Sequence, residues 1–106
     1  MLNQMIIVGR IARDVEKKDV DGKSFVELEL AVPRSYKNED GIYETDFIDC
    51  LLWNGIADNV EEYCKQGDLV GVKGRLQTQI VDDHKTTNVI AEKVTFLSSS
   101  KQKEEE

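Results

Sequence analysis

The chain has 106 residues, enough for one domain with one hydrophobic core, and its 40% hydrophobic and 33% charged residues are typical of a soluble globular protein. It carries 14 Lys and Arg against 21 Asp and Glu, and this net charge of −7 argues against a nucleic-acid binder that relies on overall positive charge. No apolar run approaches the roughly 20 residues that span a bilayer, and the N-terminus lacks a signal-peptide pattern. We therefore expect a cytoplasmic protein without a membrane segment, in which any nucleic-acid site is a local basic feature.

The N-terminal segment predicts one strand followed by an irregular region. Residues 5–12 are rich in β-branched side chains, and Gly9 within them indicates a bend or a close approach of another backbone. Residues 14–21 are charged and show no periodicity, so we expect them to be irregular. Asp21-Gly22 is a strong turn signal.

Residues 23–33 alternate strictly between apolar and other side chains, which predicts a second strand with one face on the core. The core face holds Val26, Leu28, Leu30 and Val32. Pro33 has no backbone N–H to donate, so we expect central pairing to end there. Residues 34–42 are polar and contain a Gly turn, which predicts a loop.

Residues 43–53 predict a third strand whose two faces are both largely apolar. One face carries Ile48, Cys50 and Leu52, and the other carries Phe47, Asp49, Leu51 and Trp53. A small domain buries one strand face more easily than two, so the second face is either additional core or a platform for flat groups. Nucleic-acid bases are flat, and stacking a base on an aromatic ring is worth roughly 1–3 kcal/mol.

Residues 55–66 are the only helix candidate, with Asn54 as its N-cap and Gly67 as its stop. The residues expected on its packed face are Ile56, Val60, Tyr63 and Cys64.

Two further strands are predicted at residues 68–79 and 86–97, joined by a hairpin loop at 82–85. Lys73 and Arg75 share one face of the first of these strands. Residues 98–106 contain no apolar side chain, which predicts a short disordered tail after a folded domain at residues 1–97.

The expected order is three strands, one helix and two strands. An all-β chain with a single helix between strands three and four fits a five-stranded OB-fold barrel. Such a barrel offers a curved face and long hairpin loops to an oligonucleotide.

A set of ordered segments also resembles the bacterial single-stranded DNA-binding protein (SSB) family. These segments appear in the family's order over roughly residues 1–97, and they occur at 5–11, 30–36, 45–48, 52–53, 57–60, 63, 65–70 and 72–78. The resemblance implies an OB fold and sequence-independent binding of single-stranded DNA in replication, recombination or repair. It also implies a homotetramer, with a dimer as the alternative.

The aromatic residues that stack bases in this family fall on Tyr36, Phe47 and Trp53. For phosphate and backbone contacts we expect Arg10, Arg34, Lys37, Lys73 and Arg75. Alternative interpretations remain open: the rings can belong to the core or rim, and the cations can belong to a solvated edge.

The chain departs from the family pattern at three places. Val81 occupies the position of a fourth aromatic residue, and Asp49 places a carboxylate on the face of Phe47 and Trp53. The chain ends in Lys101–Glu106, without the family's acidic tip that ends in Phe and recruits enzymes, so we expect a short form.

No pattern indicates catalysis or a bound cofactor. There is no Gly-rich phosphate loop and no Ser/His/Asp arrangement, so we expect a protein that is not an enzyme. His84 is the only histidine and no CxxC pair exists, which argues against zinc, and Cys50 and Cys64 are expected to be free thiols. The alternatives to DNA binding are a primosomal-type OB module for protein interaction and, third, an RNA-binding OB module.

Overall fold

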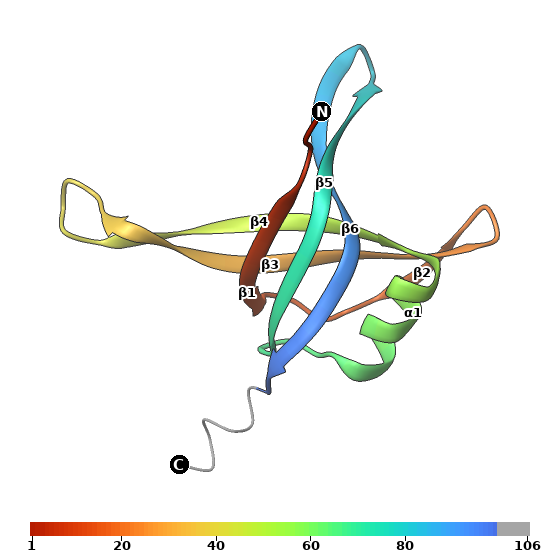
Figure 1. Ribbon diagram of the computed structural model, residues 1–106, viewed down its shortest axis with the longest axis horizontal. Helices are drawn as coiled ribbons and strands as arrows, with labels where there is room; N and C mark the ends of the chain where they lie inside the picture. The colour runs from red at the N-terminus through yellow and green to blue at the C-terminus, as the bar shows by residue number, and fades with distance from the viewer. Residues whose placement is uncertain (100–106) are drawn as a thin grey trace.

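A computed structural model describes residues 1–99 as six strands and one helix. In chain order these elements are β1 (Met5–Ile11), β2 (Lys17–Val20), β3 (Lys23–Lys37), β4 (Tyr43–Trp53), α1 (Asn54–Tyr63), β5 (Leu69–Val81) and β6 (His84–Ser98). Two long hairpins, β3–β4 and β5–β6, project from a central barrel (Figure 1). Ser98 still belongs to β6, and the remainder of the predicted tail from residue 100 lies outside the described residues.

Five of the strands close into a barrel. β1 pairs with β5, β5 with β6, β6 with β4 and β4 with β3, and the register of Arg10 with Ala31 returns β3 to β1. All pairs are antiparallel except β4–β6, which is parallel at Cys50 and Val89. Helix α1 lies between β4 and β5 in the chain, so the predicted barrel with one helix is confirmed.

The prediction of an irregular segment at residues 14–21 is wrong, because Lys17–Val20 forms β2 against residues 23–26 of β3. All four β2 residues are exposed, so the strand carries no apolar alternation that sequence reading detects. The tight turn at Asp21 and Gly22 brings β2 alongside β3, and the Gly22 N–H donates to Asp19 Oδ1 at 2.9 Å.

The two other predicted loops are shorter than expected. β3 continues without a break to Lys37, with a shift of its register against β4 between Pro33 and Lys37, so Tyr36 lies on a strand rather than in a loop. The β5–β6 turn needs only Asp82 and Asp83, with φ of 51° and 63°, and His84 already pairs with Val81. Both hairpins therefore extend further from the barrel than the sequence suggested.

The boundaries of α1 also differ from the prediction. Asn54 is the first helical residue, with φ of 57°, and the N-cap is Trp53, without a side-chain cap bond. The helix ends at Tyr63, whose side chain is 70% exposed rather than packed. Gly67 lies in the following turn, where its φ is 94° and its N–H donates to the carbonyl of Ile11.

The core fills the barrel interior and the contact with α1. The alternating residues predicted for β3 and β4 lie there, and α1 adds Ala57 and Val60. Fully buried side chains include Val26, Leu28, Leu30, Cys50, Leu52, Val70 and Val72. Burial raises the pKa of the Cys50 thiol to about 11, so this cysteine is neutral packing at physiological pH.

Two glycines permit the close strand approaches that barrel closure requires. A Cβ on Gly9 would lie 2.7 Å from the carbonyl oxygen of Ala31, where β1 joins β3. A Cβ on Gly74 would collide with the carbonyl oxygen of Ile90, where the β5–β6 register shifts. At Gly71, the nearest atoms would lie at 3.8 Å and 3.9 Å, which is ordinary contact.

We expect Gly74→Ala to destabilise the fold by about 1–3 kcal/mol, because the added methyl group must displace a backbone carbonyl. Thermal unfolding should show a midpoint lower by roughly 4–8 °C per kcal/mol. Gly71→Ala, on the same strand, is the control and should change stability little. Equal midpoints for the two variants would contradict the close approach at Gly74.

Candidate nucleic-acid interface

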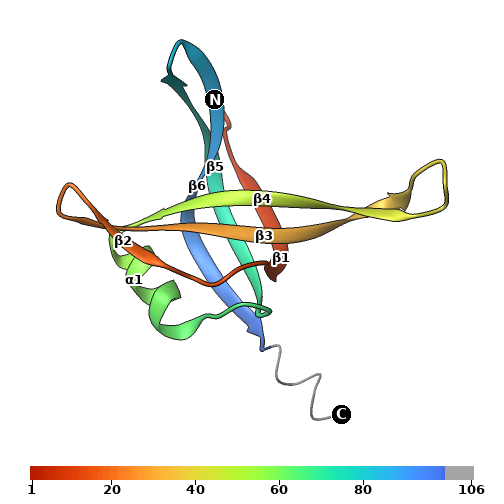
Figure 2. The same cartoon turned by 180° about the vertical axis from the view of Figure 1, so that it is seen from behind.

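The outer face of β3 and β4 presents paired side chains in rows across the two strands. The register places Phe25 opposite Trp53, Glu27 opposite Leu51, Glu29 opposite Asp49 and Ala31 opposite Phe47. Phe47 is 62% exposed while Cys50 and Leu52 are buried beneath the sheet, which confirms the two predicted faces of β4. This face is turned toward the viewer in Figure 2.

Trp53 at the end of β4 packs against Phe25 of β3. The ring centroids are 4.5 Å apart, and the ring planes are inclined by 43°. Trp53 also borders a cleft lined by Val20, Asp21, Lys23 and Asn54, so one carboxylate and one cation line the cleft beside Trp53. Sequence reasoning missed Phe25 as a member of this site: the alternation of residues 23–33 put it off the core face, but only the register shows its partner.

The extended β3–β4 hairpin carries a second aromatic group. Tyr36 is 62% exposed on β3, and Tyr43 lies on β4 opposite Lys37. The Lys37 Nζ is 5.6 Å from the centroid of the Tyr43 ring, a cation–π distance. Tyr43 is a second aromatic residue that the sequence analysis did not assign to the site.

Arg34 is already engaged by carboxylates on the neighbouring strand. Its Nη2 donates to Asp46 Oδ1 at 2.9 Å, its Nε to Asp46 Oδ2 at 3.1 Å and its Nη1 to Glu44 Oε1 at 3.3 Å. The hydrogen bond from Arg34 holds the pKa of Asp46 below its usual value, so the pair stays charged at neutral pH. A phosphate must compete with both carboxylates for this guanidinium.

Arg10 lies in the same row as Phe47. It pairs with Ala31, which in turn pairs with Phe47, so the three residues cross β1, β3 and β4 on the outer face. Its Nη1 donates to the carbonyl oxygen of Gly67 at 3.0 Å. The structure thus brings Arg10 to the aromatic face, with one nitrogen occupied.

Lys73 and Arg75 lie on a different side of the barrel from Phe47 and Trp53. Lys73 faces outward from β5, opposite Ile6 of β1 and Lys93 of β6. Arg75 contacts Gln77 at 2.6 Å and Glu92 at 3.6 Å. β5 is in front in Figure 1 and behind β3 and β4 in Figure 2, so one strand of DNA meets both groups only by passing around the barrel.

Val81, at the fourth aromatic position of the resemblance, is exposed at the tip of the β5–β6 hairpin. The tip therefore offers an aliphatic surface rather than a ring. Within residues 1–99, no group of three or more His, Cys, Asp or Glu side chains is arranged to hold a metal ion. In the same range, no helix is both long and apolar enough to cross a membrane.

Comparison with known proteins identifies the family. The model of the "Single-strand binding protein family" matches residues 2–97. A "Single-stranded DNA-binding protein" of Halalkalibacterium halodurans is 42% identical over 103 residues, which cover 92% of this chain and 61% of the relative. "Single-stranded DNA-binding protein B" of Bacillus subtilis is 38% identical and is covered to 91%, with 92% of this chain aligned.

A solved structure supports the fold. The crystal structure of a deletion mutant of the single-stranded DNA binding protein from Thermus aquaticus matches with a TM-score of 0.78 and 21% identity, over 92% of this chain and 51% of that chain. The chain thus spans about half to two thirds of the length of several proteins that it matches, and nearly all of the Bacillus subtilis protein. By its family model and its relatives, the chain belongs to the single-strand binding protein family.

Proposed function

We propose that this chain binds and protects single-stranded DNA without sequence preference in replication, recombination or repair. It acts as a binding protein in the cytoplasm rather than as an enzyme. Family membership supports this function, and the observation that carries it is the exposed aromatic face of β3 and β4. An exposed Phe47 gains little from burial in the free protein, but a base stacked on it gains roughly 1–3 kcal/mol.

Aromatic groups occur at three places along β3 and β4. The Phe25–Trp53 pair lies at one end, Phe47 lies near the middle, and Tyr36 lies on the projecting hairpin. Stacking is sequence-tolerant because every base has a flat face. A series of stacking sites therefore selects DNA that is single-stranded and long enough to reach them, whatever its sequence. The cations that would neutralise phosphates along this path are Arg10, Lys37 and, after exchange of its carboxylate partners, Arg34.

The primosomal-type protein module is not favoured. Both relatives described above are named for single-stranded DNA binding, and neither printed name indicates a role in protein recruitment. The aromatic residues that stacking requires are present, and Tyr36 and Phe47 are exposed.

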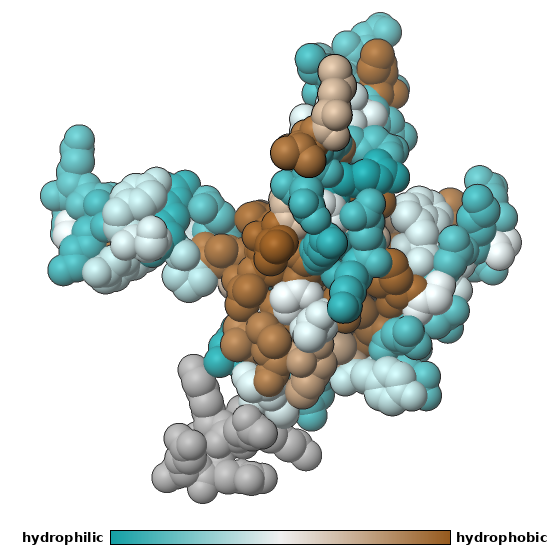
Figure 3. Space-filling model, viewed as in Figure 1, coloured by the Kyte–Doolittle hydropathy of each residue, from teal (hydrophilic) through white to brown (hydrophobic). Residues whose placement is uncertain are grey.

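For the assembly, we infer a homotetramer from the family and from an unpaired edge of β1. β1 pairs with β5 through Met5–Arg10 but with β3 only at Arg10 and Ile11, so among residues 1–99 the other edge of its first residues has no strand partner. Ile6, Val8 and Leu97 are 71%, 50% and 48% exposed. Figure 3 shows apolar surface over β1 and the adjoining ends of β5 and β6. An exposed apolar face beside a free strand edge favours association with another copy.

Trp53 is the only tryptophan, and oligo(dT) should quench its fluorescence, because a base stacked on the Phe25–Trp53 pair alters the indole environment. The titration should saturate, and the affinity should fall with added salt, since phosphate contacts release counterions. Labelled oligo(dT) followed by anisotropy provides an independent readout. Absence of both quenching and anisotropy change at low salt would refute DNA binding.

Phe47→Ala and Tyr36→Ala should each weaken oligo(dT) binding by about 1–3 kcal/mol, which is roughly 5- to 150-fold, because each removes one stacking surface. The double variant should abolish measurable binding while leaving the thermal midpoint nearly unchanged. Tyr63→Ala is the matched control, since Tyr63 is an exposed aromatic residue on α1 away from this face. If Tyr63→Ala lowers affinity as much as Phe47→Ala, the proposed face is wrong.

Sedimentation at micromolar concentration should give the mass of four chains. Introducing charge at the β1 edge, as in Ile6→Lys with Val8→Lys, should release smaller species because two buried charges are costly at an apolar contact. Ile42→Lys is the control, because Ile42 is equally apolar and exposed but lies in the β3–β4 turn. A wild-type monomer at this concentration would overturn the assembly.

A further inference from the structure

Three carboxylates interrupt the aromatic face between its two central platforms. Glu27, Glu29 and Asp49 occupy the rows between the Phe25–Trp53 pair and the Ala31–Phe47 row. Trp53 and Phe47 are six residues apart on β4, a span of about 20 Å at the usual rise per strand residue. A single strand that stacks on both platforms therefore passes directly over this acidic gap, where phosphates and carboxylates repel each other.

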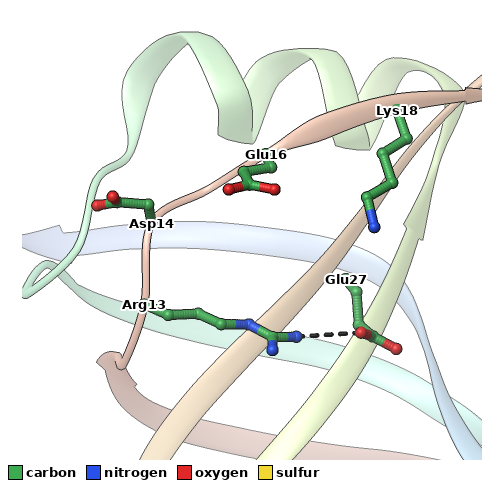
Figure 4. A pocket seen from close by; sticks show the side chains of 5 residues that line it. All are labelled: Arg13, Asp14, Glu16, Lys18 and Glu27. Atoms are coloured by element: carbon green, nitrogen blue, oxygen red, sulfur yellow. Dashed lines mark hydrogen bonds and ion pairs between the residues drawn. The ribbon is translucent and has the colours of Figure 1, made fainter.

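One cation crosses the acidic gap. Arg13 lies in the segment between β1 and β2, and its Nη2 is 3.0 Å from Glu27 Oε1 and 3.5 Å from Asp49 Oδ1. It thereby links a carboxylate on β3 with one on β4. Figure 4 shows the Arg13 side chain extended toward Glu27, and the same pocket is lined by Lys18 and by two further carboxylates, Asp14 and Glu16.

The way in which Arg13 is held leaves donors available. Both carboxylates use Nη2, and neither Nη1 nor Nε has a hydrogen-bond partner within residues 1–99. The side chain is about half exposed, so these donors are accessible from the outer face. Arg34 differs, because all three of its guanidinium nitrogens bond to Asp46 or Glu44. A guanidinium has five N–H donors in a planar fork, so it can hold carboxylates on one side and an oxyanion on the other.

We propose that Arg13 is the phosphate contact at the centre of the DNA face. Through Nη2 it offsets Glu27 and Asp49, and through Nη1 and Nε it binds the phosphate that passes between the Phe47 and Trp53 platforms. The inference rests on the proposed function and adds a residue to its binding site.

The test compares Arg13→Gln with Lys17→Gln by oligo(dT) anisotropy over a range of salt concentrations. Lys17→Gln is a close control, because this substitution also removes one positive charge. The Lys17 Nζ pairs with Asp58 on α1, at 3.4 Å, and not with the carboxylates of the acidic gap. Arg13→Gln should weaken binding about tenfold at low salt and reduce the salt slope by roughly 0.7, the value for one phosphate contact to a single strand. Lys17→Gln should change both quantities much less.

Asp49→Asn and the double variant Arg13→Gln/Asp49→Asn separate the two parts of the role. Asp49→Asn should strengthen binding, and it should reduce the affinity lost through Arg13→Gln, because Arg13 then has one carboxylate fewer to offset. The reduction in salt slope should persist in the double variant. Thermal unfolding of each variant establishes that the fold is intact.

Two results would overturn the inference while leaving the proposed function standing. The first is that the wild-type chain binds oligo(dT) but Arg13→Gln and Lys17→Gln have the same affinity and the same salt slope. The other is a loss of affinity in Arg13→Gln with an unchanged salt slope, which would leave Arg13 a structural link between strands. Failure of the wild-type chain to bind oligo(dT) would instead refute the proposed function itself.

Discussion

The face proposed to bind DNA depends on the register between β3 and β4. In a small barrel the inner side of each strand is used by the core, and here Cys50 and Leu52 are buried against Leu28 and Val26 of β3. Because side chains alternate, the residues between them face solvent. A shift of one residue would turn Phe47 and Trp53 inward and the core residues outward. The same pairing that forms the core therefore aligns the aromatic groups outside it.

The charge that this face presents to a ligand depends on its local ion pairs rather than on the net charge of the chain. The chain is acidic overall, and its cations near the aromatic groups are largely matched with carboxylates, as Arg34 is with Asp46 and Arg13 with Glu27. Such half-exposed ion pairs contribute little to stability. Their effect on binding is larger, because each carboxylate competes with phosphate for the same donors. Under the proposal made above, cations that retain unused donors, such as Arg13, are the ones available to a phosphate.

The two sides of the barrel have different surfaces. β3 and β4 carry rings and ion pairs, whereas β1 with the adjoining parts of β5 and β6 carries exposed aliphatic side chains and a free strand edge. Close approach at Gly9 joins the two sides, because it lets β1 reach β3 and complete the barrel. The face proposed for DNA and the surface proposed for association between copies thus lie mainly on different sides of one small core.

The sequence by itself determined the barrel and the faces of its long strands, because a period of two is a local property that Val26 to Val32 and Ile48 to Leu52 display directly. It also indicated Phe47, Trp53 and the close approach at Gly9. It did not indicate β2, whose exposed residues pair through a turn without burying apolar surface, or the exposure of Tyr63 at a helix end. Only the tertiary structure decided that Phe25 meets Trp53, that Arg13 spans Glu27 and Asp49, and that Lys73 lies on the other side of the barrel. These are relations between strands, and they depend on register and closure, which no single segment of the chain encodes.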